Sequence, residues 1–239
     1  MKDNRSYYDD FAGWYDRGRD QGYHAFLDRS QLSLFAPHVA NARICEVGCG
    51  TGLLLKEVAP HAAQSVGIDL SRGMLMQARD RQLNVVQGSA TCLPVPDACF
   101  DLVYSFKVLP HVEDIQLALE EVARILVPGG RAFLEFYNSQ SIRHLIKQLK
   151  PAHAVSDDTK DTEVYTRYDS PQRAASYLPT TLTLLRMHGI RVITPSALFH
   201  RVPIVKSVVQ WSETLAQASF LGPRFGGFLI LEVLRSEHS

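Results

Sequence analysis

Cysteine is scarce in this sequence, and its spacing gives no sign of a metal centre. Only four cysteines occur among 239 residues, with three residues between Cys45 and Cys49 and six between Cys92 and Cys99. No histidine cluster accompanies either pair, so the pattern is not that of a zinc site. We therefore expect reduced thiols, as in a cytoplasmic protein, and no bound metal.

Long apolar runs and an excess of one charge are also absent. The longest apolar stretch, around 227–234, is interrupted by Glu232, whereas a membrane span needs about 18 apolar residues. The charged N-terminus lacks the apolar core of a signal peptide. Lys plus Arg and Asp plus Glu number 25 each, so no basic field would gather a nucleic acid. We expect a cytoplasmic monomer or homodimer that acts on a small molecule, without nucleic-acid or membrane partners.

Short apolar runs alternate with helical patterns from position 42 onward. The runs predict five strands, at Arg43–Val47, Ser65–Asp69, Asn84–Gln87, Phe100–Ser105 and Arg131–Tyr137. Before the fifth strand, apolar residues recur at helical spacing over 115–125, and the Pro-Gly-Gly at 128–130 ends that helix. Such alternation is typical of an α/β fold with a parallel sheet and crossover helices.

The remaining segments depart from this regular pattern. Residues 189–194 and 227–234 predict two further strands, the last of them antiparallel, with a helix near 204–219 between them. Two segments have no predicted place in the sheet, and we expect them to be lids, with mobile tips near 155–163. The chain is thus predicted to be one domain, 1–239. It comprises an N-terminal lid (1–40), a cofactor-binding core (41–138), a lid insertion (139–188) and a final unit of strands and a helix (189–239).

A glycine-rich loop follows the first predicted strand. It reads EVGCGTG at 46–52 and precedes a helical pattern, so its backbone can turn tightly and approach a ligand at a helix N-terminus. Asp69 ends the second strand, 21 positions after Gly48. An acid at this spacing can accept hydrogen bonds from both ribose hydroxyls. Loop and acid together predict a nucleoside site rather than a plain strand-to-helix turn.

The spacing of the glycines distinguishes between nucleosides. A dinucleotide loop reads G-x-G-x-x-G, whereas this loop reads G-x-G-x-G and begins with Glu46. We expect Glu46 to repel a diphosphate and to balance a cationic amino-acid head, whose carboxylate the helix terminus can hold. S-adenosylmethionine fits these expectations better than a nicotinamide dinucleotide does. A nicotinamide-dependent oxidoreductase and a non-catalytic binding module remain as alternatives.

Five motifs stand in order along the chain: EVGCGTG at 46–52, GIDLS at 67–71, GSATCLP at 88–94, FDLVYS at 100–105 and EVARILVPGG at 121–130. Together they resemble the class I S-adenosylmethionine-dependent methyltransferases, especially the branch of ubiquinone and menaquinone methyltransferases and natural-product methyltransferases. The resemblance implies a doubly wound, mostly parallel sheet of seven strands in the order 3-2-1-4-5-7-6. It also implies S-adenosylmethionine across the carboxyl ends of strands 1 to 4.

The resemblance assigns the cofactor contacts residue by residue. Asp69 would take the ribose hydroxyls, and Leu70 and Met74 would pack on the adenine, although Met74 is equally expected in the core. Tyr15 would cover the cofactor or else anchor the first helix. The implied cofactor-binding residues are Tyr15, Glu46, Gly48, Cys49, Gly50, Asp69, Leu70, Met74, Ser89, Ala90, Ser105 and Phe106.

One position departs from the family pattern. After the third strand, relatives place an acid that accepts from the adenine amino group, whereas this chain has Ser89 and Ala90. A hydrogen bond to a charged group contributes about 1.5–3 kcal/mol, and one between neutral groups about 0.5–1.5 kcal/mol. We therefore expect weaker cofactor affinity and unchanged chemistry.

His111, just past the fourth strand, is the candidate general base for methylation of a hydroxyl or enol, because an imidazole accepts protons near neutral pH. It can also be a packing residue held by Asp114. Lys107, Tyr137, Asn138 and Tyr168 are candidate substrate contacts, with packing or surface roles as the alternative. The acceptor is expected to be small and apolar or aromatic, with oxygen as the favoured methylated atom.

Overall fold

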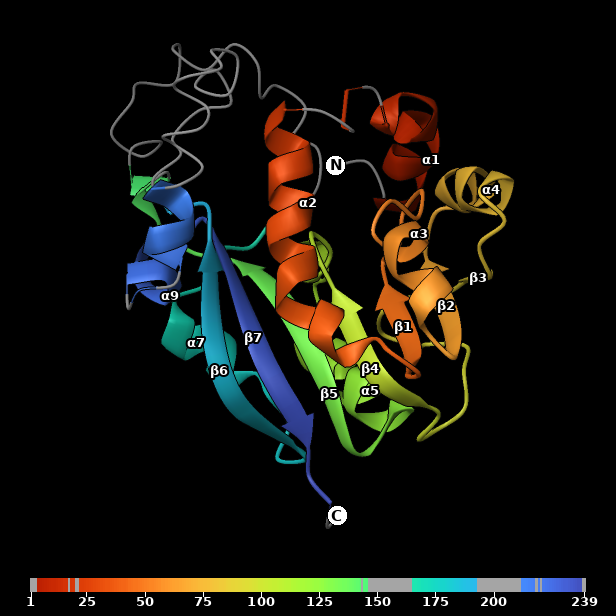
Figure 1. Cartoon of the computed structure of the whole chain (residues 1–239). Coiled ribbons are helices and arrows are strands. Elements are labelled where there is room, and N and C mark those ends of the chain that lie inside the picture. The colour runs from red at the N-terminus through yellow and green to blue at the C-terminus, as the bar shows by residue number, and fades with distance from the viewer. Residues whose placement is uncertain are drawn as a thin grey trace.

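Most of the chain is described by a computed structural model, shown in Figure 1. The described residues are 4–237 except 17, 20, 21, 143, 146–164, 193–211, 218 and 220. The tips predicted near 155–163 lie outside them, as does most of the helix predicted near 204–219, of which the described part, 212–217, is helical. Within the described ranges, no helix combines the length and the apolarity of a membrane span.

Helices and strands alternate over the first half of the chain. The named helices are α1 (Asn4–Tyr15), α2 (Gly22–Phe35), α3 (Leu55–Val58), α4 (Arg72–Asp80), α5 (Ile115–Ile125), α7 (Pro171–Ser176) and α9 (Leu221–Phe225). The strands are β1 (Arg43–Val47), β2 (Gln64–Asp69), β3 (Val85–Gln87), β4 (Phe100–Ser105), β5 (Leu126–Tyr137), β6 (Leu182–Ile190) and β7 (Phe228–Arg235). Single 3-10 turns lie at Ala36–His38, Ala59–His61 and Leu109–His111.

The strands form one sheet in the order β3-β2-β1-β4-β5-β7-β6. β1 to β5 pair in parallel, and β7 runs antiparallel to both β5 and β6. The predicted α/β fold, with this strand order and an antiparallel last strand, is confirmed. Because the parallel strands all end at the same edge, the loops after β1, β2, β4 and β5 gather there (Figure 1), which is where open α/β sheets bind ligands.

Alternating side chains along the strands build two cores, one on each face. On β5, for example, Phe133 packs with α2 and α4 on one face, whereas Leu134 packs with α5 and α7 on the other. In Figure 1, α2 crosses the front of the sheet while α5 and α7 lie behind it. The face that α2 covers also receives the side chains of Glu46, Tyr104 and Glu135, by the same alternation along their strands. All three are buried, so this face carries polar groups close to the carboxyl edge.

The first four predicted strands are confirmed to within one residue. The fifth is longer than predicted, because β5 begins at Leu126, directly after α5. Leu126 pairs with Phe100 and Arg131 pairs with Leu102. The Pro-Gly-Gly between them therefore lies in an irregular bulge within the strand, with Gly129 at a φ of 76°.

The strand predicted at 189–194 is wrong in position, because β6 occupies Leu182–Ile190. It ends where Arg191 adopts a left-handed φ of 64°. The segment 139–188 therefore supplies most of a strand and cannot lie wholly outside the sheet. In the pairing with β7, Leu184 faces Val233 and Arg186 faces Glu232, which leaves Leu185 as an extra residue in a bulge.

Candidate functional site

The glycine loop between β1 and α3 presents backbone at the carboxyl edge of the sheet. Gly48, Gly50 and Gly52 have φ angles of 78°, 53° and 79°, in the left-handed region that glycine adopts without a steric cost. The N–H of Gly48 donates to the Ile68 carbonyl at 2.6 Å and ties the loop to β2. No heavy atom lies within 4 Å of where a Cβ on Gly50 would be, so this turn offers open backbone to a ligand.

Asp69 ends β2 directly beside that loop. Its Oδ2 accepts from the Gly50 N–H at 2.7 Å, and its Oδ1 accepts from the Ser71 N–H at 2.8 Å. Burial raises the pKa of the Asp69 carboxyl, although these two donors act in the opposite direction. A carboxylate oxygen can accept more than one hydrogen bond. The structure thus brings the predicted loop and the predicted acid together, with lone pairs left for a further donor.

Two carboxylates fasten the α1 region to loops of the site. Asp9 accepts from the Ser71 hydroxyl at 2.6 Å, and this contact is the main reason that the pKa of Asp9 is lowered. Asp16 accepts from the Thr51 hydroxyl at 2.7 Å. Ser71 also caps α4 by accepting from the Met74 N–H at 3.1 Å. The N-terminal segment is therefore held against both the glycine loop and the loop after β2.

A narrow cavity lies between this segment, the glycine loop and the end of β4. Its lining residues are Tyr15, Arg19, Asp28, Glu46, Gly48, Cys49, Thr51, Leu53, Leu54, Phe106 and Lys107. Asp28 lies 2.8 Å from the Lys107 Nζ and 3.9 Å from the Arg19 guanidinium. An ammonium group needs an acceptor and a carboxylate needs donors, so one acid with two cations fits the head group of an amino acid.

Glu46 was expected to act as a charged group at the ligand site, but it is buried. Its side chain is 4% exposed, and the Tyr104 hydroxyl donates to it at 3.2 Å. Burial raises the pKa of Glu46 well above its usual range, with Asp69 and Asp28 adding to the effect. Burial therefore opposes the charged form of Glu46, on which the expected repulsion of a diphosphate depends, and that repulsion stays a prediction. The charges facing the cavity come from other residues.

A second buried acid, Glu135 on β5, holds the turn after β4. It accepts from the Lys107 N–H at 3.0 Å and from the Gln31 side-chain amide at 2.5 Å. Lys107 has a φ of 63°, a left-handed conformation that costs free energy outside glycine. Burial raises the pKa of Glu135 to about 7. Within the described residues, the Gln31 Oε1 atom has no hydrogen-bond partner.

Glu135→Gln is expected to remove a pH dependence of folding stability. Because the folded-state pKa of about 7 exceeds the ordinary 4.5, the contribution of Glu135 is full below pH 4.5 and is lost as the pH rises through 7. The shift corresponds to about 3 kcal/mol. Urea unfolding between pH 5 and pH 8 should show the wild type losing most of this free energy relative to the variant. Parallel pH curves for the two proteins would contradict the assignment.

His111 lies in the 3-10 turn after β4 and joins an aromatic cluster. Its Nδ1 is 2.9 Å from the Tyr165 carbonyl oxygen and 3.2 Å from the Thr166 hydroxyl. Its Nε2 is 3.4 Å from the Tyr137 hydroxyl, and the rings of Tyr137 and Tyr168 are 5.6 Å apart. His111, Tyr137 and Tyr168 were singled out separately in the sequence, and the fold brings them together at the carboxyl edge.

Other predicted residues use their side chains within the framework. The buried Ser105 donates its hydroxyl to a β1 carbonyl at 2.9 Å. The buried Asn138 donates to the Arg224 carbonyl at 3.0 Å and accepts from the Gln140 N–H at 2.9 Å. Asp114 caps α5 by accepting from the Leu117 N–H at 3.1 Å. For Ser105, this leaves mainly backbone groups to meet a ligand.

The predicted adenine side is only partly open. Leu70 is 39% exposed beside Asp69, whereas Met74 is 2% exposed and packs as a core residue. The Ser89 hydroxyl lies 2.8 Å from that of Thr91 and accepts from the Thr91 N–H at 3.2 Å. Ser89 therefore closes its own turn, and Ala90 is half-buried against the core beside it.

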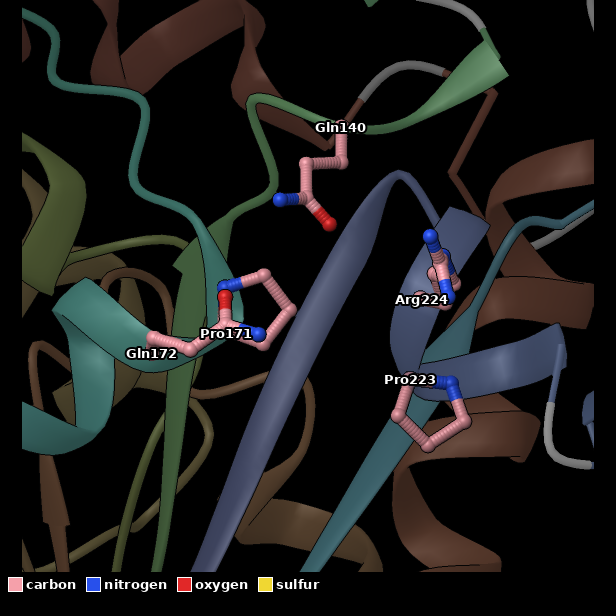
Figure 2. Close-up of a pocket in the computed structure, with 5 residues that line it drawn as sticks. All are labelled: Gln140, Pro171, Gln172, Pro223 and Arg224. Carbon is pink, nitrogen blue, oxygen red and sulfur yellow. The ribbon is translucent and has the colours of Figure 1, made fainter.

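A second, larger hollow is drawn in Figure 2, and no residue of the glycine loop is among its walls. Its volume is about 240 Å³, and its walls are Gln140, Pro171, Gln172, Pro223 and Arg224, from the loop after β5, α7 and α9. None of the residues predicted for the site lines it. Asn138 links this hollow to the predicted site residues, because its side chain bonds the backbone of three of the walls, Gln140, Pro223 and Arg224.

Several polar residues of the site were not predicted from the sequence. Arg19, Asp28 and Gln31 belong to the N-terminal segment, where no motif marks them, and Glu135 lies within the apolar second half of β5. In the sequence, the Asp28 carboxylate and the Gln31 amide are typical of the polar face of a surface helix. Only a buried acid inside β5 was a visible signal, because Glu is rarely buried without a partner.

Known proteins resemble this chain over the same region of motifs and strands. A family described as a methyltransferase domain matches residues 45–134. The ubiquinone biosynthesis O-methyltransferase of Xylella fastidiosa is 28% identical over 180 residues, which cover 70% of this chain and 72% of that protein.

Two solved structures share the fold. A methyltransferase of Thermotoga maritima, described as a possible histamine N-methyltransferase, has a TM-score of 0.69 at 18% identity, over 96% of this chain and 98% of its own. The N-methyltransferase NodS of Bradyrhizobium japonicum, solved with S-adenosyl-L-homocysteine, has a TM-score of 0.65 at 14% identity, over 98% and 99%.

Proposed function

We propose that the chain methylates an oxygen of a small, apolar or aromatic acceptor. Its motifs, its sheet order and its relatives are those of an S-adenosylmethionine-dependent methyltransferase. The observation that carries this proposal is the contact between Gly50 and Asp69 at the ends of β1 and β2. Beside them lies a cavity with one carboxylate and two cations. These are the groups that an adenosyl amino acid requires.

The chain's own residues divide the work of holding the cofactor. Asp69 would take the ribose hydroxyls with its remaining lone pairs. Asp28 would accept a hydrogen bond from the cofactor amino group. Arg19 and Lys107, which now pair with Asp28, would also bind the cofactor carboxylate. The open backbone at Gly50 lets the ligand approach closely.

Bound S-adenosylmethionine supplies an activated methyl group on a positively charged sulfur. The protein must therefore align the acceptor and exclude water, and correct alignment alone can contribute about 7–11 kcal/mol. Tyr15 and the segment fastened by Asp9 and Asp16 lie over the cavity and serve as its cover. The half-exposed aromatic cluster of Tyr137, Tyr168 and His111 is the acceptor side, with His111 as the base.

Oxygen is the favoured acceptor atom for two reasons. A hydroxyl or enol needs a base as its oxygen takes the methyl group, and His111 stands at the edge where the base is required. The relative from Xylella fastidiosa is also named as an O-methyltransferase. The proposal includes a cytoplasmic monomer or homodimer whose partner is the small molecule alone, without nucleic acid.

Asp69→Ala is expected to weaken binding of S-adenosylhomocysteine by tenfold or more. The loss of hydrogen bonds to a charged acceptor costs about 1.5–3 kcal/mol. Calorimetry measures the affinity, and the urea midpoint shows that the variant is folded. Asp97→Ala is the matched control, because that carboxylate is 75% exposed on the surface. Unchanged affinity in Asp69→Ala would place the cofactor elsewhere.

A methyl-transfer screen tests the function itself. Small phenols, enols, amines and carboxylates are incubated with the full chain and S-adenosylmethionine, and mass spectrometry detects a gain of one methyl group. We expect phenols or enols to react. Transfer confined to amines would overturn the oxygen assignment, and cofactor binding without any transfer would favour a non-catalytic binding module.

A further inference from the structure

We propose that Tyr137 relays the acceptor proton to His111 and that the backbone carbonyl of Tyr165 sets the imidazole tautomer for this step. The inference rests on the proposed O-methylation and assigns the route by which the proton leaves. It arises from one geometric fact: the basic nitrogen of His111 faces a phenol hydroxyl.

The Tyr165 carbonyl decides which nitrogen of His111 carries the proton. A carbonyl oxygen only accepts hydrogen bonds, and it lies 2.9 Å from Nδ1. An unprotonated Nδ1 would set two lone pairs against each other at this distance, so Nδ1 carries the hydrogen. The Thr166 hydroxyl, 3.2 Å from the same nitrogen, can share that hydrogen as a second acceptor. The lone pair of the neutral imidazole is therefore on Nε2.

Tyr137 stands in front of that lone pair. Its hydroxyl is 3.4 Å from Nε2, and the two rings meet edge to face with centroids 5.6 Å apart. The distance is long for a hydrogen bond, as is common for catalytic pairs before substrate binds. The proposed relay places the acceptor hydroxyl against the Tyr137 phenol oxygen, which then connects it to Nε2 of His111.

The short segment that carries the Tyr165 carbonyl is tied to both strands of the site. The Arg167 N–H donates to the Pro110 carbonyl at 2.8 Å, beside His111. The Asp169 N–H donates to the Tyr137 carbonyl at 2.8 Å. Arg167 and Asp169 also form an ion pair of 2.9 Å, in which Asp169 is 1% exposed. The segment thus fixes the loop after β4 relative to the end of β5, and with it the spacing of the pair.

The proton moves in a balanced step. As the acceptor oxygen bonds to the methyl carbon, the electron pair of the methyl–sulfur bond stays on sulfur, and the acceptor loses its proton to the Tyr137 oxygen. Tyr137 passes its own hydroxyl proton to Nε2 of His111. The phenol is restored and the imidazolium returns its proton to water, so no oxidant or further reactant is needed.

Nitrogen NMR of the full chain tests the pair without turnover. Histidine-labelled protein is recorded with and without S-adenosylhomocysteine for the wild type, Tyr137→Phe and the control Tyr168→Phe. We expect the wild type to carry hydrogen on Nδ1, and the Nε2 resonance of His111 to shift in Tyr137→Phe but not in Tyr168→Phe. Hydrogen on Nε2, or an Nε2 resonance indifferent to Tyr137→Phe, overturns the relay.

Turnover with catechol, a simple phenol, separates this inference from the proposed function. The relay predicts that Tyr137→Phe loses at least about tenfold in turnover. The double variant Tyr137→Phe/His111→Ala should be no slower than His111→Ala alone, because both residues act in one step. If His111→Ala loses turnover while Tyr137→Phe keeps it, the relay is overturned and His111 is still the general base. No methylation of catechol by the wild type counts against the proposed acceptor class, while the NMR result still decides the pair.

Discussion

His111→Ala lowers turnover by about 10²- to 10⁴-fold if the proposed base is correct, with little change in the affinity for S-adenosylhomocysteine. This range is what general base catalysis contributes when a side chain is positioned for proton transfer. The affinity is spared because His111 is not among the residues that line the cavity proposed for the cofactor. Single-turnover methyl transfer gives the rate, and calorimetry gives the affinity.

Two outcomes would remove His111 from the chemistry. Full turnover in His111→Ala would reduce it to a packing residue beside Tyr137 and Tyr165. A fall in cofactor affinity as large as the fall in turnover would mean that the substitution disturbs the loop after β4. His61→Ala, in the short turn after α3, is the control for loss of an imidazole elsewhere on the chain.

Gly48→Ala should destabilise the cofactor-free chain by about 2–4 kcal/mol, from overpacking together with left-handed strain. A Cβ at this position would lie 2.0 Å from Val108 Cγ2 and 2.9 Å from Val108 Cβ. Valine branches at Cβ and cannot swing away. The φ of 78° adds a cost for any side chain. Urea unfolding measures the loss of free energy.

The same loop supplies the control. Gly50→Ala makes the same chemical change at a φ of 53°, where nothing lies within 4 Å of the added carbon. It should therefore cost only about 1–2 kcal/mol of backbone strain. Val108→Ala should recover part of the Gly48→Ala loss in the double variant. Equal losses at the two glycines would show that the contact with Val108 is unimportant.

The parts of the site that follow from local sequence were predictable. The left-handed turn at Gly50 and the acid at Asp69 are fixed by residues within each strand and its following loop. Their meeting at 2.7 Å then follows from the parallel pairing of β1 and β2. β6 was misplaced because its burial does not alternate cleanly along the strand, so its sequence lacks the period-two signal.

The electrostatics of the site could not be predicted in the same way. Asp28 and Lys107 are 79 positions apart, and only the docking of α2 on the sheet brings their charges to 2.8 Å. For Glu46 the motif identifies the residue but not the pKa of its carboxyl, which burial raises. The protonation of a carboxyl depends on what covers it, which a motif does not contain.

The extra residue at Leu185 has a consequence for how copies of this protein can associate. β6 closes one end of the sheet, and a straight outer strand would offer its free N–H and C=O groups as a template for a neighbouring chain. The irregularity at Leu185, beside the charged Arg186, bends that outer strand and interrupts the template. Self-association by continuing the sheet from one copy into the next is thereby discouraged at this end.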